Sequence, residues 1–122
     1  ILFTVGGTVL GESVSSERFD PFWQRAEALG VPVFMHPTSA AQLVKEDALA
    51  GNGDLGNIIG NPLETTVFLS RLIFDGTLDR FPELTICAPH AGGYLPSYLS
   101  RSEVACDVRP RANCQNEKMP SE

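Results

Sequence analysis

The pattern of hydrophobic and polar positions predicts two units in which a helix is followed by a strand. The first helix begins at Asp20 and Pro21, a good N-cap residue followed by a residue suited to the first helical turn, and it ends at Gly30. The run VPVFMH that follows, residues 31–36, is apolar and partly β-branched, which is typical of a buried strand in a parallel sheet. Because proline cannot donate a hydrogen bond to a sheet, Pro32 is expected at the very start of this strand.

The second unit repeats this arrangement. Asn61, Pro62 and Glu64 have the spacing of a cap, a first-turn proline and a capping-box acid. The helix that follows is so apolar that we expect it to be mostly buried, and it breaks at Gly76. The next strand is LTICAPH, residues 84–90.

The remaining segments complete an α/β pattern. A strand is predicted over residues 1–5 and a helix over 94–105, whereas 37–60 is a long connection with a short helix around 40–50. Residues 107–122 are predicted to be a polar loop leading towards a further strand. Strands alternating with helices predict fold class α/β with three parallel strands. These strands could form a small open sheet or a slice of a barrel. The whole chain, residues 1–122, is expected to be one unit.

Composition and charge narrow the class of protein. The chain has 122 residues, of which 43% are hydrophobic and 20% charged, as in ordinary globular proteins. Its apolar runs are too short to cross a bilayer and no leader segment is visible, so no membrane partner is expected. The net charge of −6 comes from 15 acidic and 9 basic residues. The basic residues are too few and too scattered to neutralise a row of phosphates, so nucleic acid is not an expected partner.

The three cysteines, Cys87, Cys106 and Cys114, form no CxxC pair. Their odd number argues against a disulfide framework, so we expect free thiols and a reducing, cytoplasmic location. Cys87 lies inside a predicted strand and is expected in the core. Its side chain and that of His90 should point to opposite faces, which disfavours a Cys–His dyad.

The two histidines of the chain each end a predicted strand. His36 precedes Pro37, and His90 precedes Ala91-Gly92-Gly93. Because parallel strands joined by right-handed connections point the same way, both imidazoles are expected at the carboxyl-end edge of the sheet, where α/β proteins place their sites.

Neutral imidazole is both the commonest metal ligand and a general base near neutral pH, so this pair points to metal or proton-transfer chemistry. Structural histidines at two strand ends are the simpler alternative. Two histidines alone make an incomplete catalytic zinc site, and Glu46, Asp47 and Asp54 are better explained as solvated loop carboxylates than as further ligands.

Two other chemistries find no support. The loop GGTVLGES, residues 6–13, is close to a phosphate-binding loop, but Glu12 stands where the lysine is required. The chain also has no GxSxG motif, so a serine hydrolase is not indicated.

Three stretches resemble the amidohydrolase-related, metal-dependent decarboxylases, the family of aminocarboxymuconate-semialdehyde decarboxylase and the resorcylate-type decarboxylases. These stretches are LGVPVFMHP (29–37), GNPLETTVFLSRLIFDGTLDRFPEL (60–84) and HAGGYLPSYLSR (90–101), and the resemblance covers residues 17–106. It implies a partial (β/α)8 TIM barrel, in which the three predicted strands look like the fourth, fifth and sixth. Such a barrel takes about 250 residues, so we expect an interior fragment that is inactive by itself.

The resemblance also implies roles for three residues. His36 matches a metal ligand, with zinc the expected divalent cofactor, and His90 matches the catalytic histidine that acts on metal-bound water. Arg101 matches an arginine that binds a substrate carboxylate, in some members across the interface of a homodimer. The block differs from the family's usual HGGG in having Ala91.

The implied activity is decarboxylation of a small carboxylated aromatic or muconate-like substrate by the full-length protein. Two alternatives stay open: a hydrolase or hydratase of the same superfamily acting on a lactone or enol acid, and a non-catalytic α/β domain.

Overall fold

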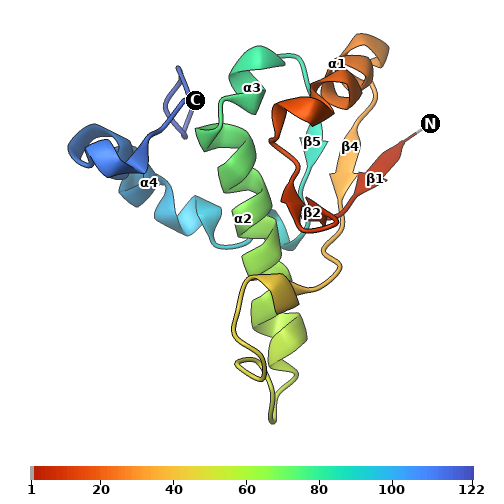
Figure 1. Cartoon of the computed structure of the whole chain (residues 1–122), viewed down its shortest axis with the longest axis vertical. Coiled ribbons are helices and arrows are strands. Elements are labelled where there is room, and N and C mark those ends of the chain that lie inside the picture. The colour runs from red at the N-terminus through yellow and green to blue at the C-terminus, as the bar shows by residue number, and fades with distance from the viewer. Residues whose placement is uncertain (1) are drawn as a thin grey trace.

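A computed structural model describes residues 2–122 of the chain, and of Pro110 the backbone alone. Its centre is a three-stranded parallel sheet with strand order β1 (Phe3–Val5), β4 (Val33–Met35), β5 (Ile86–Cys87) (Figure 1). Phe34 of the central strand lies opposite Thr4 on one side and opposite Cys87 on the other. The predicted α/β class with a parallel sheet is therefore confirmed, although the strands are shorter than expected.

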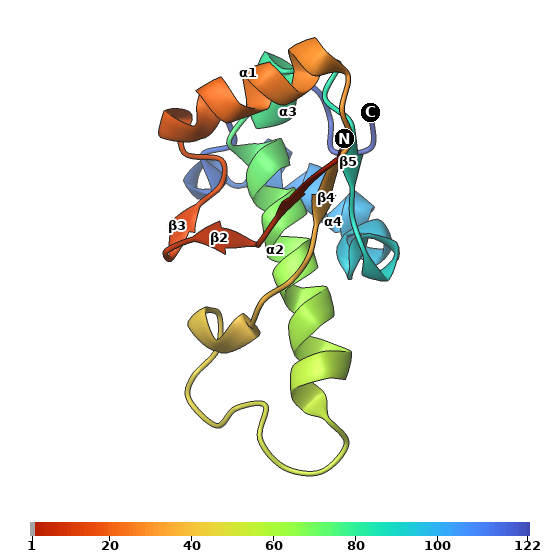
Figure 2. The same ribbon diagram turned by 90° about the vertical axis from the view of Figure 1, so that its right-hand side faces the viewer.

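Four α-helices connect and cover these strands within the described residues. They are α1 (Asp20–Leu29), α2 (Asn61–Phe74), α3 (Thr77–Arg80) and α4 (Leu99–Val108). A small antiparallel hairpin of β2 (Thr8–Val9) and β3 (Glu12–Ser13) occupies the loop after β1. Figures 1 and 2 show α1 lying across one end of the sheet and α2 running along one of its sides.

Only one face of the sheet is covered in this chain. In β4, Val33 and Met35 are buried against the helices, whereas Phe34 between them is 38% exposed. Thr4 and Cys87, its neighbours in register, are also exposed. The expectations that this strand is buried on both faces and that Cys87 lies in the core are therefore wrong here, because no element between residues 2 and 122 packs on the second face.

The covered face forms the hydrophobic core. Trp23 of α1 is 1% exposed, and its indole Nε1 donates a 2.9 Å hydrogen bond to the carbonyl oxygen of Val14. Phe68 and Leu72 of α2, one turn apart, are fully buried against the sheet. The expectation that α2 is mostly shielded from solvent is confirmed, since Arg71 is its single exposed residue.

Both helix starts differ from the capping that the sequence suggested. Asp20 is the first residue of α1 rather than its cap, and its carboxylate accepts hydrogen bonds of 3.0 Å from Nε and Nη2 of Arg80. Asn61 likewise lies inside its helix, and Glu64 makes no capping box. The reason is the same in both places: a 3-10 turn over Glu17–Phe19 and a π-helical turn over Gly56–Gly60 run directly into the helices.

The long connection and the last helix also differ in detail. The short helix expected around residues 40–50 is a single 3-10 turn, Ala40–Gln42. The helix expected over 94–105 begins as a 3-10 turn, Leu95–Tyr98, and continues as α4 to Val108. The segment predicted as loop from residue 107 therefore begins in a helix and contains another short turn, Pro110–Ala112.

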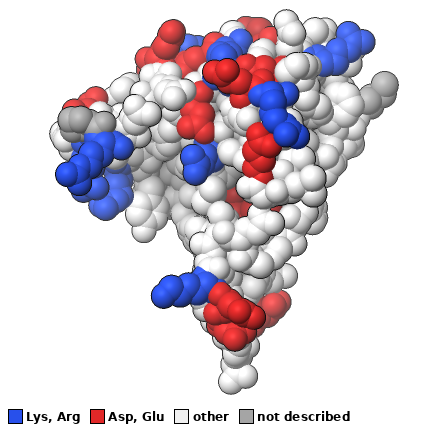
Figure 3. All heavy atoms as spheres, viewed as in Figure 1, with Lys and Arg blue, Asp and Glu red and all other residues white. Residues whose placement is uncertain are grey.

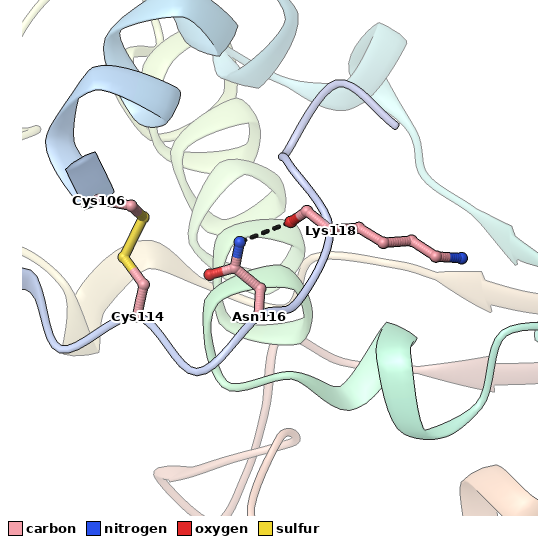
Figure 4. Close-up of a disulfide and its surroundings, with 4 residues drawn as sticks. All are labelled: Cys106, Cys114, Asn116 and Lys118. Carbon is pink, nitrogen blue, oxygen red and sulfur yellow. Dashed lines mark hydrogen bonds between the residues drawn. A yellow bond between two sulfur atoms is a disulfide. The ribbon is translucent and has the colours of Figure 1, made fainter.

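A disulfide joins Cys106 to Cys114, with their Cα atoms 5.8 Å apart (Figure 4). The prediction of three free thiols is wrong, because α4 continues past Cys106 and the turn after it leads Cys114 back alongside. Cys87 is the free cysteine. The cytoplasmic location stays a prediction, and it no longer has three free thiols to support it.

Charges are mixed over the face shown in Figure 3, where basic and acidic side chains neighbour one another around a broad uncharged area. Among the helices described here, none combines the length and apolar character needed to cross a membrane.

Candidate functional site

Both histidines follow the carboxyl ends of neighbouring parallel strands. His36 comes directly after β4, and its backbone amide donates to the carbonyl oxygen of Val5 at the end of β1. His90 comes three residues after β5. Phe34 pairs with Cys87, and His36 and His90 follow this pair by two and three residues on adjacent parallel strands. Adjacent strands lie about 4.8 Å apart, so the two histidine backbones belong to one edge of the sheet.

The ring of His36 has its Nδ1 against the chain and its Nε2 free. Its Nδ1 lies 2.9 Å from the carbonyl oxygen of Pro37. A carbonyl oxygen only accepts, so Nδ1 carries the proton and Nε2 keeps a free lone pair. Metal-binding histidines usually donate their other ring nitrogen to a carbonyl or carboxylate in this way, and the exposed His36 therefore fits a metal ligand.

His90 begins a left-handed turn. Its φ is 54°, and those of Ala91, Gly92 and Gly93 are 50°, 83° and 66°. A left-handed conformation costs a residue with a Cβ roughly 1–2 kcal/mol, so His90 and Ala91 must be held in place by their surroundings.

Helix α2 supplies that support. A Cβ on Gly93 would clash with the carbonyl oxygen of Pro62, so the turn approaches the helix closely enough to require glycine. The backbone amide of Tyr94 donates to Oγ1 of Thr66 at 2.7 Å. One residue earlier on the helix, Oγ1 of Thr65 lies 3.0 Å from Nδ1 of His90.

Glu64 supports the other loops of this edge. It is 4% exposed, and its carboxylate accepts hydrogen bonds from the backbone amides of Gly7 (3.0 Å), Thr38 (3.1 Å to each oxygen) and Ser39 (2.8 Å). A Cβ on Gly7 would lie 2.6 Å from Cγ and Oε1 of Glu64. The residues that follow β1 and β4 are therefore held by one buried carboxylate.

The triplet Glu64-Thr65-Thr66 was not predicted from the sequence as part of the site. The available signal was three consecutive polar residues in a helix that is otherwise strongly apolar. Two of them, Glu64 and Thr65, are buried.

Arg101 lies apart from this edge. It is exposed on α4 and borders a hollow of 320 Å³ with neighbours from its own helix and Arg109. In Figure 1, α2 lies between α4 and β4. No hydrogen bond or ion pair joins Arg101 to either histidine within residues 2–122. Its binding role stays a prediction.

The acidic residues of the long connection do not complete a metal site. No group of three metal-binding side chains comes together among residues 2–122, and this covers Glu46, Asp47 and Asp54.

Comparison with known proteins gives consistent matches. A family model described as amidohydrolase matches residues 3–110. A 2-amino-3-carboxymuconate-6-semialdehyde decarboxylase of Dictyostelium discoideum is 31% identical over 106 residues, which cover 87% of this chain and 28% of that protein. A gamma-resorcylate decarboxylase of Rhodococcus jostii is 34% identical over 87 residues, which cover 69% of this chain and 26% of that protein.

Solved structures agree on the fold. A 5-carboxyvanillate decarboxylase from Sphingomonas paucimobilis matches with a TM-score of 0.85 at 24% identity, covering 98% of this chain and 36% of that one. A 2,6-dihydroxybenzoate decarboxylase, complexed with 2,6-dihydroxybenzoate, matches with a TM-score of 0.72 at 26% identity, covering 88% and 34%. The chain thus spans about a quarter to a third of the length of these relatives.

Proposed function

Since this chain belongs to the amidohydrolase family, we propose that it forms part of a metal-dependent decarboxylase acting on a small carboxylated aromatic or muconate-like substrate. The matched relatives named above are decarboxylases of such acids. The observation that carries the proposal is the pair of histidines at one sheet edge, with Nδ1 of each ring held by the chain.

In this proposal β1, β4 and β5 are the fourth, fifth and sixth strands of a (β/α)8 barrel. The bare sheet face would then be the barrel interior, covered by parts of the protein outside this chain. Exposed Phe34 and Cys87 support this assignment, because they put apolar and thiol side chains on a face that nothing in residues 2–122 covers. Cys87 should react slowly with a thiol reagent in the folded full-length protein and quickly after denaturation. Rapid labelling of the folded protein would contradict the barrel assignment.

Each predicted residue has one task. His36 would bind the divalent metal, which we propose to be zinc, through Nε2. When bound, that metal would polarise a substrate oxygen as a Lewis acid. His90 would hold and move a proton at neutral pH, as decarboxylation replaces a carboxyl group by a proton. Arg101 would bind a substrate carboxylate with two parallel hydrogen bonds.

The exposed position of Arg101 on α4 supports delivery to a second copy in a homodimer, because this helix has no buried residue in the chain described. Sedimentation of the full-length protein should show a dimer. Arg101→Lys should raise KM for the acid more than it lowers kcat. A monomer with full activity would contradict the shared arrangement.

The test of the proposed function is CO2 release by the full-length protein that contains this chain. Substrates to compare are 2,6-dihydroxybenzoate, 5-carboxyvanillate and 2-amino-3-carboxymuconate semialdehyde, before and after chelation and with zinc restored. His36→Ala should lose metal and activity together, whereas His90→Ala should keep the metal and lose about 10²–10⁴-fold in kcat.

Asp54→Asn, a change in the loop carboxylate, is the control and should alter neither metal content nor turnover. Hydrolysis without CO2 release would favour the hydrolase alternative. Unchanged metal content and turnover in both histidine variants would contradict the proposal.

A further inference from the structure

Thr65 lies at the meeting point of α2, β4 and the His90 turn. It is fully buried, and its Oγ1 is 3.0 Å from Nδ1 of His90, 3.1 Å from the carbonyl oxygen of Asn61 and 3.7 Å from Sδ of Met35. We propose that Thr65 is a positioning residue that fixes His90 as the Nδ1–H tautomer and so leaves Nε2 free to accept a proton. This inference rests on the proposed function for its effect on catalysis, but the tautomer itself is independent of it.

The number of available protons fixes the direction of these hydrogen bonds. The hydroxyl of Thr65 has one proton to donate, and the carbonyl oxygen of Asn61, four residues earlier, can only accept it. Threonine in a helix commonly donates to that carbonyl. The hydroxyl oxygen is then an acceptor towards His90, so Nδ1 must carry the proton that lies between them.

The opposite tautomer makes one hydrogen bond fewer. If Thr65 donated to a bare Nδ1 of His90, its hydroxyl would no longer bond to Asn61. Water cannot replace that bond, because the Thr65 side chain is fully buried. Donation to the sulfur of Met35, a weak acceptor, would also turn the proton away from His90 and leave the same tautomer.

The surroundings keep the ring in reach of this hydroxyl. The left-handed backbone at His90 and Ala91 leads the chain back over α2, and Thr66 fixes the far end of the turn through the amide of Tyr94. Two consecutive threonines therefore divide the work: Thr66 holds the backbone and Thr65 sets the ring.

The experiment is nitrogen NMR of the full-length protein labelled with ¹⁵N-histidine, at a pH where the rings are neutral. In the wild type, His90 should show a protonated Nδ1 and an unprotonated Nε2. Thr65→Val keeps the shape of the side chain but removes the hydroxyl, and it should abolish this pattern. Thr65→Ser should restore it, while the signals of His36 in the same spectra stay unchanged.

Activity provides the second readout. Thr65→Val should lower kcat about tenfold, the equivalent of one net hydrogen bond, with metal content and KM unchanged and with recovery in Thr65→Ser.

A protonated Nε2 on wild-type His90 would overturn the inference, and this result needs no variant to fold. An unchanged His90 pattern in folded Thr65→Val would overturn it as well. A wild type with the expected tautomer but no CO2 release would instead contradict the proposed function and leave the assignment of the ring intact.

Discussion

Glu64 gives the sharpest test of how the sheet edge is held together. Its buried carboxylate accepts from three backbone amides that belong to two different loops, those of Gly7, Thr38 and Ser39. Glu64→Ala removes all of these acceptors at once, and Glu64→Gln removes one of the two oxygens while keeping the volume of the side chain.

The structure sets the expected magnitudes. Gly7 is buried, so its amide would be left without a partner in Glu64→Ala, which costs about 1–3 kcal/mol. Thr38 and Ser39 are exposed, so water can replace part of what their amides lose. Together these effects predict a destabilisation of about 3 kcal/mol. In Glu64→Gln, the side-chain NH2 group would replace Oε2 and face the backbone N–H of Ser39, which donates to Oε2 at 2.8 Å in the wild type. Because two donors would then face each other, the free energy of unfolding should fall by about 1.5 kcal/mol.

The assay is equilibrium unfolding of the full-length protein in urea, with the slope of the transition compared between variants. Gly7→Ala disturbs the same contact between Gly7 and Glu64, because the added Cβ would lie 2.6 Å from the Glu64 side chain. The control is Glu27→Gln. Glu27 also accepts one backbone amide, that of Glu83 at 2.8 Å, but in an exposed setting, so it should lose under about 1 kcal/mol. Equal effects of Glu64→Gln and Glu27→Gln would refute the reasoning.

Three further changes test other contacts. Reduction of the Cys106–Cys114 disulfide should lower the free energy of unfolding by about 2–3 kcal/mol. Alkylation of the denatured protein should label Cys87 but not Cys106 or Cys114 before reduction, and all three after it; label on Cys106 and Cys114 without reductant would disprove the disulfide. Arg80→Lys breaks the paired hydrogen bonds to Asp20 and should cost about 1 kcal/mol in urea unfolding, with a smaller loss expected if Asp20 has already been replaced by Ala. Trp23→Ala should cost about 4 kcal/mol by thermal unfolding, and a change below about 1 kcal/mol would show that its site is not core.

Local sequence signals were sufficient for most of the elements. Pro32 lies just before β4, Gly30 ends α1 with a φ of 59°, and Gly76 separates α2 from α3 with a φ of 69°. These residues determine backbone geometry by themselves, so no tertiary information was needed. The parallel arrangement of the strands followed from the apolar runs between the helices.

The errors arose where a side chain has more than one use. Asp20 and Glu64 have the spacing of helix caps. In the structure, however, the carboxylate of Asp20 binds Arg80 and that of Glu64 binds backbone amides of other loops, such as the amide of Gly7. Spacing along the chain cannot reveal such distant partners. The exposure of Cys87 was missed for a related reason, since an apolar strand does not say whether one or both of its faces are covered.

For the site, the sequence placed both histidines at strand ends but could not set their rings. The tautomer of His36 depends on the adjacent carbonyl of Pro37, and the ring of His90 depends on a hydroxyl 25 residues earlier. The hydroxyl that meets His90 comes within reach only when α2 packs on the sheet. Arg101 shows the opposite case, because its predicted role requires groups outside the described chain.

The three consecutive polar residues of α2 have a mechanical consequence. Neighbouring side chains on a helix diverge by about 100°, so Glu64, Thr65 and Thr66 reach three separate targets from one rigid rod. A slide or rotation of this rod would carry both histidine-bearing loops with it. The geometry at the sheet edge is therefore governed by how the buried stripe of Phe68 and Leu72, further along the same helix, is seated in the core.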